Sequence, residues 1–368
     1  MAGDLHRRDW LKVAGAGLAG AAGIGVLPGC QPAAPALADL PGGFMGVALE
    51  RGHSLRPFWQ RLAQGIELPA PAAVHRAPVV IAGGGMAGLA AARALELAGV
   101  QEAVLIDTQT AMGGNSQGGQ LKGIDCPLGA HYLPVPGDSA QEVQDWLQEL
   151  GLRKQVAGRW QYDERYLCHS PQERLYLGGQ WQEGLLPVHG VGARTLAQYA
   201  LFERCMNTAM AEAAFAMPSI RVWQREGKLP EAHARLDAQR FDHWLVQQGL
   251  DDEYLFWYLN YCCRDDFGAG IHRVSAWAGL HYFASRHGFH APRAAEDFHP
   301  DEDGEQVLTW PQGNGWLSQQ LVHRLKATQL NTDCSVLSIT DGRDGVQLDV
   351  WHHGRQQHER WLAQRCVV

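Results

Sequence analysis

The chain has 368 residues, a formal net charge of −8, 46% hydrophobic residues and 19% charged residues. A chain of this length holds about two domains, and its composition excludes both the disordered and the fibrous classes of protein. Nucleic-acid-binding domains carry a strongly basic surface. The acidic balance therefore excludes nucleic acid as the main partner.

The first 30 residues have the pattern of an export signal. The run 7–12, RRDWLK, precedes a Gly- and Ala-rich apolar run from Val13 to Leu27, which is shorter than the about 20 apolar residues of a transmembrane helix. The run 7–12 resembles the bacterial twin-arginine export signal, and the run 27–30, LPGC, resembles a lipobox. The resemblance implies a periplasmic protein that uses the twin-arginine export machinery and carries a lipid anchor at Cys30. The alternative, a cytoplasmic N-terminal helix, is disfavoured because each of the five glycines between Val13 and Gly25 costs a helix about 1 kcal/mol relative to Ala.

The eight cysteines contain no CxxC pair and no spacing typical of a metal site. Seven remain when Cys30 is set aside, and an odd number does not imply a complete disulfide framework even in an oxidising compartment. We expect mostly buried free thiols and no metal.

Residues 31–43 are rich in Pro, Ala and Gly and indicate a tether. The rest of this N-terminal extension, up to residue 76, has no clear pattern.

Residues 77–137 contain a pattern typical of a dinucleotide-binding βαβ unit. We predict a strand at Val79–Ala82, a helix at Met86–Leu97 and a strand at Ala103–Asp107. Asp107 lies 19 residues after Gly88, where an acidic side chain accepts hydrogen bonds from the ribose of an adenosine.

Three glycines between the first strand and the helix follow G-x-G-x-x-G. Gly83 permits the tight turn, Gly85 lets the backbone approach a pyrophosphate, and Gly88 lets the helix pack close to the sheet. The phosphates would lie at the positive helix N-terminus, beside Met86 and Ala87. The alternative is a glycine-rich turn that binds no ligand.

Further motifs resemble those of one enzyme family. Asp107 is followed after five residues by Gly113 and Gly114, then by Asn115, and this resembles the second glycine motif of FAD enzymes of the glutathione reductase-like superfamily. The run 129–132, GAHY, resembles the segment behind the flavin in flavin-containing amine oxidases and phytoene desaturases. The run 310–317 and the strand 336–339 resemble that family's Pro/Gly helix start and its adenine-contacting strand.

The resemblance covers residues 78–131 and 308–368, and it implies an α/β fold. That fold is a glutathione reductase-like FAD-binding Rossmann domain with an inserted, mainly helical substrate domain. The insert is expected at 138–305, with helices at Ser139–Leu150 and Ala197–Phe215, and the return to the FAD domain at 306–368. There we predict a helix and three strands: Trp316–Lys326, then Ser335–Thr340, Val346–His352 and Arg365–Val368.

The glycine motif and the resemblance together name the expected FAD-binding residues. They are Gly83, Gly85, Met86, Ala87, Gly88 and Asp107 for the ADP half, Gly113, Gly114 and Asn115 near the diphosphate, and His131, Tyr132 and Val336 around the flavin and the adenine. No catalytic side chain is named.

The resemblance implies an FAD-dependent oxidoreductase of the amine oxidase-like type that oxidises a small organic substrate by hydride transfer to flavin. A desaturase or isomerase of the same fold shares every cofactor residue named above. Two departures matter: Asn115 stands where the family usually carries Arg, and the family continues beyond the strand at which this chain stops. The second departure indicates that either this sequence or the gene product itself is truncated, and a truncated, inactive, membrane-tethered lipoprotein is therefore a further alternative.

Overall fold

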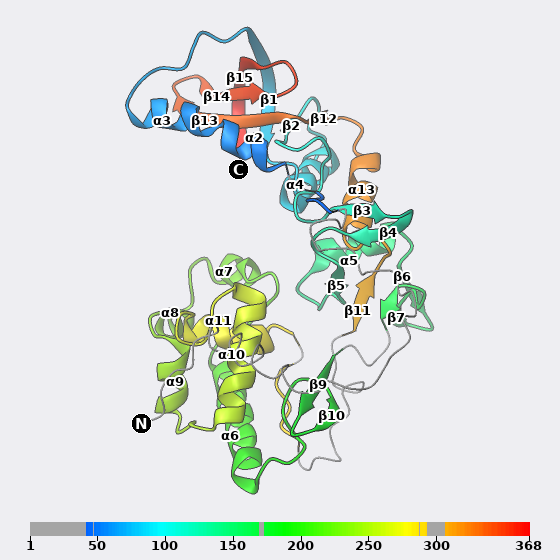
Figure 1. Ribbon diagram of the computed structural model, residues 1–368, viewed down its shortest axis with the longest axis vertical. Helices are drawn as coiled ribbons and strands as arrows, with labels where there is room; N and C mark the ends of the chain where they lie inside the picture. Colours follow the sequence, from blue (N-terminus) through cyan, green and yellow to red (C-terminus); the bar gives the residue numbers. More distant parts are fainter. Residues whose placement is uncertain (1–41, 47, 169–172, 287, 293–305) are drawn as a thin grey trace, which may run out of the picture. The chain divides into compact units, whose positions relative to one another are not determined.

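The computed structural model describes residues 42–46, 48–168, 173–286, 288–292 and 306–368 (Figure 1). The chain divides into a short unit, Met1–Phe44, and a large unit, Met45–Val368. All elements described below belong to the large unit. The predicted export signal and Cys30 lie outside the described residues.

A six-stranded sheet forms the nucleotide-binding part, with the strand order β12-β2-β1-β15-β14-β13 (Figure 1). Its parallel strands are β12 (Gln329–Asn331), β2 (Val104–Ile106), β1 (Ala73–Ala82) and β15 (Gln357–Val367). Strands β14 (Gly345–His352) and β13 (Cys334–Gly342) continue the sheet in antiparallel pairing. The last 11-residue strand therefore lies beside the first one, along the middle of the sheet.

Neighbouring residues of the parallel strands alternate between two cores, as expected for a sheet that is covered on both faces. Ile81 and Leu105 pack against α4 (Met86–Leu97) and α13 (Gly315–Arg324), in a core that includes Leu89. Val80 lies in the other core, with Leu348 of β14 and Trp361 of β15. This two-sided burial explains why β1 ends in a continuous apolar run.

The N-terminal extension contributes two helices, α2 (Leu49–Ser54) and α3 (Arg56–Ala63). Proline lies in the first turn of α3, where its missing N–H leaves no bond unmade. The ring of Phe58 contacts that of Trp351 on β14, with 4.7 Å between centroids. Strand β1 begins at Ala73, so the predicted boundary at residue 76 falls inside a strand.

Short strands connect the sheet to the helical part of the insert. Hairpins are formed by β3 with β4, by β6 with β7 and by β9 with β10, while β11 pairs with both β5 and β8. Their bounds, with helix α5, are β3 Gly118–Leu121, β4 Ile124–Pro127, β5 Tyr132–Pro134, α5 Gln141–Glu149, β6 Arg153–Val156, β7 Arg159–Tyr162, β8 Leu167–Cys168, β9 Arg174–Leu177, β10 Gln180–Glu183 and β11 Val307–Thr309. The predicted insert is thus helical only after its first part.

The later part of the insert is helical, as predicted. Its helices are α6 Ala193–Glu212, α7 Ile220–Glu226, α8 Glu231–Asp237, α9 Phe241–Gln247, α10 Glu253–Phe267 and α11 Ala276–Ala284. They surround a core of their own in which the ring of Phe202 contacts those of Phe241, Phe283 and Phe289. The insert therefore has a hydrophobic core separate from that of the sheet.

The cysteines of the described residues are all free thiols. Cys262, Cys263 and Cys334 are buried, and burial raises the pKa of each thiol, to about 12 for Cys262 and Cys263. The other four are only half-buried, so the expectation of mostly buried thiols is too strong. None of the described helices is both long enough and apolar enough to span a membrane.

Candidate functional site

The turn between β1 and α4 has the geometry that its three glycines predict. Gly83 has a φ of +112°, a region that L side chains rarely adopt, and its amide donates to the Ile106 carbonyl on β2 at 2.8 Å. A Cβ on Gly88 would lie 1.8 Å from the Gly83 carbonyl oxygen. The predicted roles in turning the chain and in close helix packing are therefore confirmed for Gly83 and Gly88.

Helix α4 begins at Met86, with Gly85 as its N-cap and no side-chain hydrogen bond to its first turn. The first amides of a helix have no partner within the helix, and the helix dipole makes this end positive. The amides of Met86 and Ala87 therefore lie in a first turn that no side chain caps, which is the arrangement that binds an anion.

The second pair of glycines, Gly113 and Gly114, packs directly on the turn between β1 and α4. The Gly113 amide donates to the Gly84 carbonyl at 2.8 Å, and Gly85 and Gly113 form a parallel bridge. A Cβ on Gly114 would lie 2.9 Å from the Cα of Gly85. Two glycine segments that are 30 residues apart in the sequence, 83–85 and 113–114, thus form one surface of backbone atoms, which we call the glycine surface.

Asp107 lies at this surface, but backbone amides already use its carboxylate. Oδ2 accepts a hydrogen bond from the Gly84 amide and Oδ1 from the Gln109 amide, each at 2.7 Å. A carboxylate offers about four lone-pair sites, so both oxygens can accept a further bond. The role of Asp107 in holding the glycine turn was not foreseen, and its predicted role at a ribose stays a prediction.

Asn115 connects the second glycine pair to the predicted flavin segment. Its carbonyl accepts from the Ala130 amide at 2.9 Å, and a Cβ on Gly129 would lie 2.2 Å from the same oxygen. The close approach explains the glycine at 129, since any side chain there would displace Asn115.

His131 and Tyr132 are held through their backbone by the segment that precedes α13. The Thr309 hydroxyl donates to the His131 carbonyl at 3.0 Å, and the Asn314 amide side chain donates to the Tyr132 carbonyl at 2.8 Å. The two rings contact each other edge to face, with 4.8 Å between centroids. The structure therefore brings the predicted runs 113–115, 129–132 and 310–317 together.

Val336 lies further along the sheet, on β13. It is half-buried, pairs with Val350 on β14 and packs against the core that contains Val80. Strand β13 is joined to the site by the Cys334 amide, which donates to the Asp107 carbonyl at 2.9 Å. No described contact links the Val336 side chain to the glycine surface, and its place at an adenine stays a prediction.

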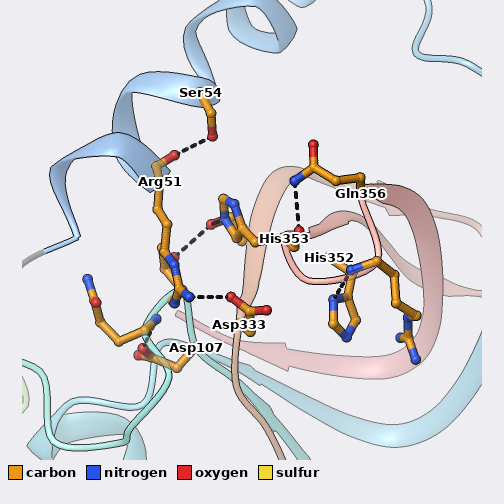
Figure 2. A network of polar contacts seen from close by, with 11 residues as sticks. Arg51, Ser54, Asp107, Asp333, His352, His353 and Gln356 are labelled. Atoms are coloured by element: carbon orange, nitrogen blue, oxygen red, sulfur yellow. Dashed lines mark hydrogen bonds and ion pairs between the residues drawn. The ribbon is translucent and has the colours of Figure 1, made fainter.

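A polar cluster beside Asp107 was missed by the sequence analysis (Figure 2). Arg51 of α2 contacts both the Thr108 carbonyl and Asp333, and the Ser335 hydroxyl bonds to Thr108 and to His353. Burial, together with the positive charge of Arg51, lowers the pKa of His353. No sequence signal could have found this cluster, because its members lie up to 302 residues apart and follow no motif.

Within the described residues no group of three or more His, Cys, Asp or Glu side chains is placed to hold a metal ion.

Residues 81–150 match the NAD(P)-binding Rossmann-like domain family. This match covers the glycine turn, α4, β2 and the second glycine pair. The fold is therefore mixed α/β with a Rossmann-like nucleotide-binding domain. No curated protein is significantly similar to the chain in sequence.

Solved structures of an oxidase and of an isomerase are similar to the chain. Putrescine oxidase with putrescine bound has a TM-score of 0.55 and 21% identity, over 80% of this chain and 57% of that chain. A triple mutant of the same oxidase has a TM-score of 0.56 and 20% identity with the same coverage. A CLA-producing fatty acid isomerase from P. acnes has a TM-score of 0.49 and 18% identity, over 74% of this chain and 55% of that chain. The chain thus spans a little over half the length of these proteins.

Proposed function

We propose that the chain binds FAD at the glycine surface and is an FAD-dependent oxidoreductase of the amine oxidase-like type, acting on a small organic substrate. The observation that carries this proposal is the contact between the two glycine segments, through the Gly113 amide and the Gly84 carbonyl. A helix N-terminus alone offers a few amides to a diphosphate. The second segment adds two neighbouring glycines, Gly113 and Gly114, which themselves carry no side chain.

The residues of the site fit the ADP half of FAD. Gly85 has a φ of −70°, and a Cβ built on it would meet only the Cα of Gly114, at 3.8 Å. Glycine is therefore not needed there for folding, whereas a bound diphosphate would need the space that a side chain takes. A bound ligand therefore explains the glycine at position 85 better than packing does.

In this proposal each group has a separate task. The amides of Met86 and Ala87 donate to the diphosphate, and Asp107 accepts from the ribose while it holds the Gly84 amide. Asn115 keeps the segment 129–132 in place through its carbonyl. FAD, when bound, supplies the hydride acceptor that no side chain provides.

The substrate class rests on weaker support than the cofactor. The fold similarity to putrescine oxidase at 21% identity makes an amine the first class to test. A flavin-dependent desaturase reaction, which oxidises an apolar substrate, or a redox-neutral isomerase reaction is the other outcome of that test. Peroxide release with amines would favour the oxidase, and anaerobic conversion of an apolar substrate without net oxidation would favour the isomerase.

Titration of the purified full chain with FAD, NAD and NADP tests the cofactor proposal. We expect FAD to bind, with flavin absorption bands that remain after gel filtration, and to bind more tightly than NAD or NADP. Circular dichroism serves as the control for folding. A colourless, well-folded chain that does not take up added FAD would overturn the proposal and favour a scaffold without a cofactor.

Export by the twin-arginine machinery and acylation of Cys30 also belong to the proposal. Both rest on residues 1–41, which lie outside the described residues. Cell fractionation tests them: the full chain should reach the periplasm, and a variant without residues 1–30 should stay in the cytoplasm.

A further inference from the structure

Arg51 joins three parts of the chain that are distant in the sequence (Figure 2). Its Nη1 donates to the Thr108 carbonyl at 2.9 Å and its Nη2 pairs with Asp333 Oδ1 at 2.7 Å. The Arg51 and Asp333 side chains are only 22% and 20% exposed. The pair is therefore shielded enough from solvent to hold a fixed geometry, unlike most surface ion pairs.

The segments that Arg51 contacts are the two that surround Asp107. Thr108 is the next residue in the chain, and the Asp333 amide donates to the Gln109 carbonyl at 2.8 Å. Gln109 in turn donates its own amide to Asp107 Oδ1. Arg51 thus contacts both the turn 107–109, which fixes the Asp107 carboxylate, and the segment at Asp333, which bonds to this turn.

A hollow of about 340 Å³ lies at the same junction, next to Arg51 and Asp333. Its other lining residues are Glu50, Ser54, His353, Gly354 and Gln356. Helix α2 and the end of the β14–β15 hairpin therefore face each other beside the turn after β2. In a Rossmann unit, the adenosine ribose lies at the acidic residue that ends this strand.

We propose that helix α2 clamps the adenosine edge of the nucleotide site, with Arg51 as its positioning residue. This inference rests on the proposed nucleotide binding and adds a part of the chain that precedes the Rossmann unit. Arg51 neutralises Asp333, which would otherwise place a second carboxylate beside Asp107 and an anionic nucleotide. It also holds the Thr108 carbonyl, so that the turn carrying Asp107 is ordered before the nucleotide arrives.

Calorimetric titration with ADP and with FAD tests the clamp. We expect Arg51→Ala to weaken both affinities roughly tenfold, the value of one charge-assisted hydrogen bond. Arg51→Lys should restore part of the loss, because it keeps the charge but not the two-sided contact. The matched control is Arg61→Ala, since Arg61 lies on the neighbouring helix and its side chain, among the described residues, donates only to the Glu67 carbonyl.

A double variant separates positioning from a general effect on folding. If Arg51 acts by neutralising Asp333, the variant with Arg51→Ala and Asp333→Ala should bind ADP more tightly than Arg51→Ala alone. Melting of the nucleotide-free proteins shows whether each variant is folded, and Arg51→Lys remains informative should Arg51→Ala fail to fold.

Two negative outcomes are distinct. If the wild type binds ADP and FAD while Arg51→Ala and Arg51→Lys bind them with unchanged affinity, the clamp is wrong and the proposed function stands. If the wild type binds neither ligand, the proposed function fails and the clamp fails with it.

Discussion

At the scale of single residues, Asp107 couples the shape of the glycine turn to the expected ligand. One carboxylate oxygen holds the amide of Gly84 and the other holds that of Gln109. A nucleotide that binds Asp107 therefore meets a side chain whose orientation is already set by backbone donors. Substituting Asp107 would disturb both the turn and the ligand contact, which makes it a poor single test of ligand binding.

Asp242 is a densely hydrogen-bonded carboxylate of the helical insert. It lies in the first turn of α9, is 8% exposed, and accepts hydrogen bonds from the Arg240 guanidinium, the His243 amide and His272 Nδ1 at 2.7 to 3.0 Å. The hydrogen bonds from Arg240, followed by those from His272 and His243, hold the pKa of the Asp242 carboxyl well below its usual range. Its charged form is therefore favoured by folding.

We predict that Asp242→Asn destabilises the protein by about 1–2 kcal/mol near pH 7, since charge-assisted hydrogen bonds are lost but their donors remain partly solvated. A carboxyl whose pKa is lowered by folding stabilises above its unfolded pKa of about 3.9, and this contribution falls as the pH drops below that value. Urea unfolding at pH 7 and pH 3 should show a smaller difference between variant and wild type at pH 3. Asp251→Asn is the control, because Asp251 pairs with Arg194 on the exposed surface. An equal difference at both pH values would contradict the prediction.

At the scale of elements, the first turn of α4 separates glycines needed for folding from glycines kept for a ligand. A Cβ on Gly88 would overlap the Gly83 carbonyl at 1.8 Å, whereas one on Gly85 would make an ordinary 3.8 Å contact. We predict that Gly88→Ala lowers stability by about 1–3 kcal/mol or more, the usual cost of overpacking. Gly85→Ala should leave the stability of the free protein within about 0.5 kcal/mol and weaken FAD binding roughly tenfold.

Thermal melting of the free variants and titration with FAD measure the two effects separately. Gly192→Ala is the control, since Gly192 is likewise a helix N-cap, that of α6, with open space around its Cα, so alanine there should have a similar small effect on stability and none on FAD binding. Comparable losses of stability in Gly85→Ala and Gly88→Ala would show that both glycines serve packing alone.

Local patterns predicted the elements of the nucleotide-binding part well. Helix α4 has the predicted bounds, Met86–Leu97, because its glycine start and its apolar face are both local signals. Strand β15 was predicted only from Arg365, yet it begins at Gln357. The first half of β15 contains the buried polar residues His358 and Glu359. It therefore has no apolar run from which a strand could be predicted.

Pairings between segments that are distant in the sequence, or between strands without a clear pattern, could not be predicted from the sequence. The hairpins between Arg153 and Glu183 depend on short polar strands that lack a clear alternation. Arg51 could not be placed, because its partners Thr108 and Asp333 are defined only by the folded sheet. The glycine turn was predictable for the opposite reason, since its G-x-G-x-x-G motif is contained within six consecutive residues, 83–88.

At the scale of the whole molecule, burial is divided between separate cores. The core of the insert surrounds Phe202, and none of its residues belongs to the cores that cover the sheet. Leu348, which is fully buried, belongs to the sheet core together with Val80 and Trp361. Because large-to-small substitutions act through the contacts of their own core, each core can be weakened by itself.

We predict that scanning calorimetry resolves two transitions, one for each core. Phe202→Ala should cost about 3–5 kcal/mol and shift one transition, while Leu348→Ala should cost about 2–5 kcal/mol and shift the other. Substitutions at distant sites without shared partners add their effects, so the double variant should show both shifts at full size. A single transition that both variants lower together would mean that the insert and the sheet unfold as one cooperative unit. In that case a change in the insert would also weaken the nucleotide site, and the helical part would act as structural support for it.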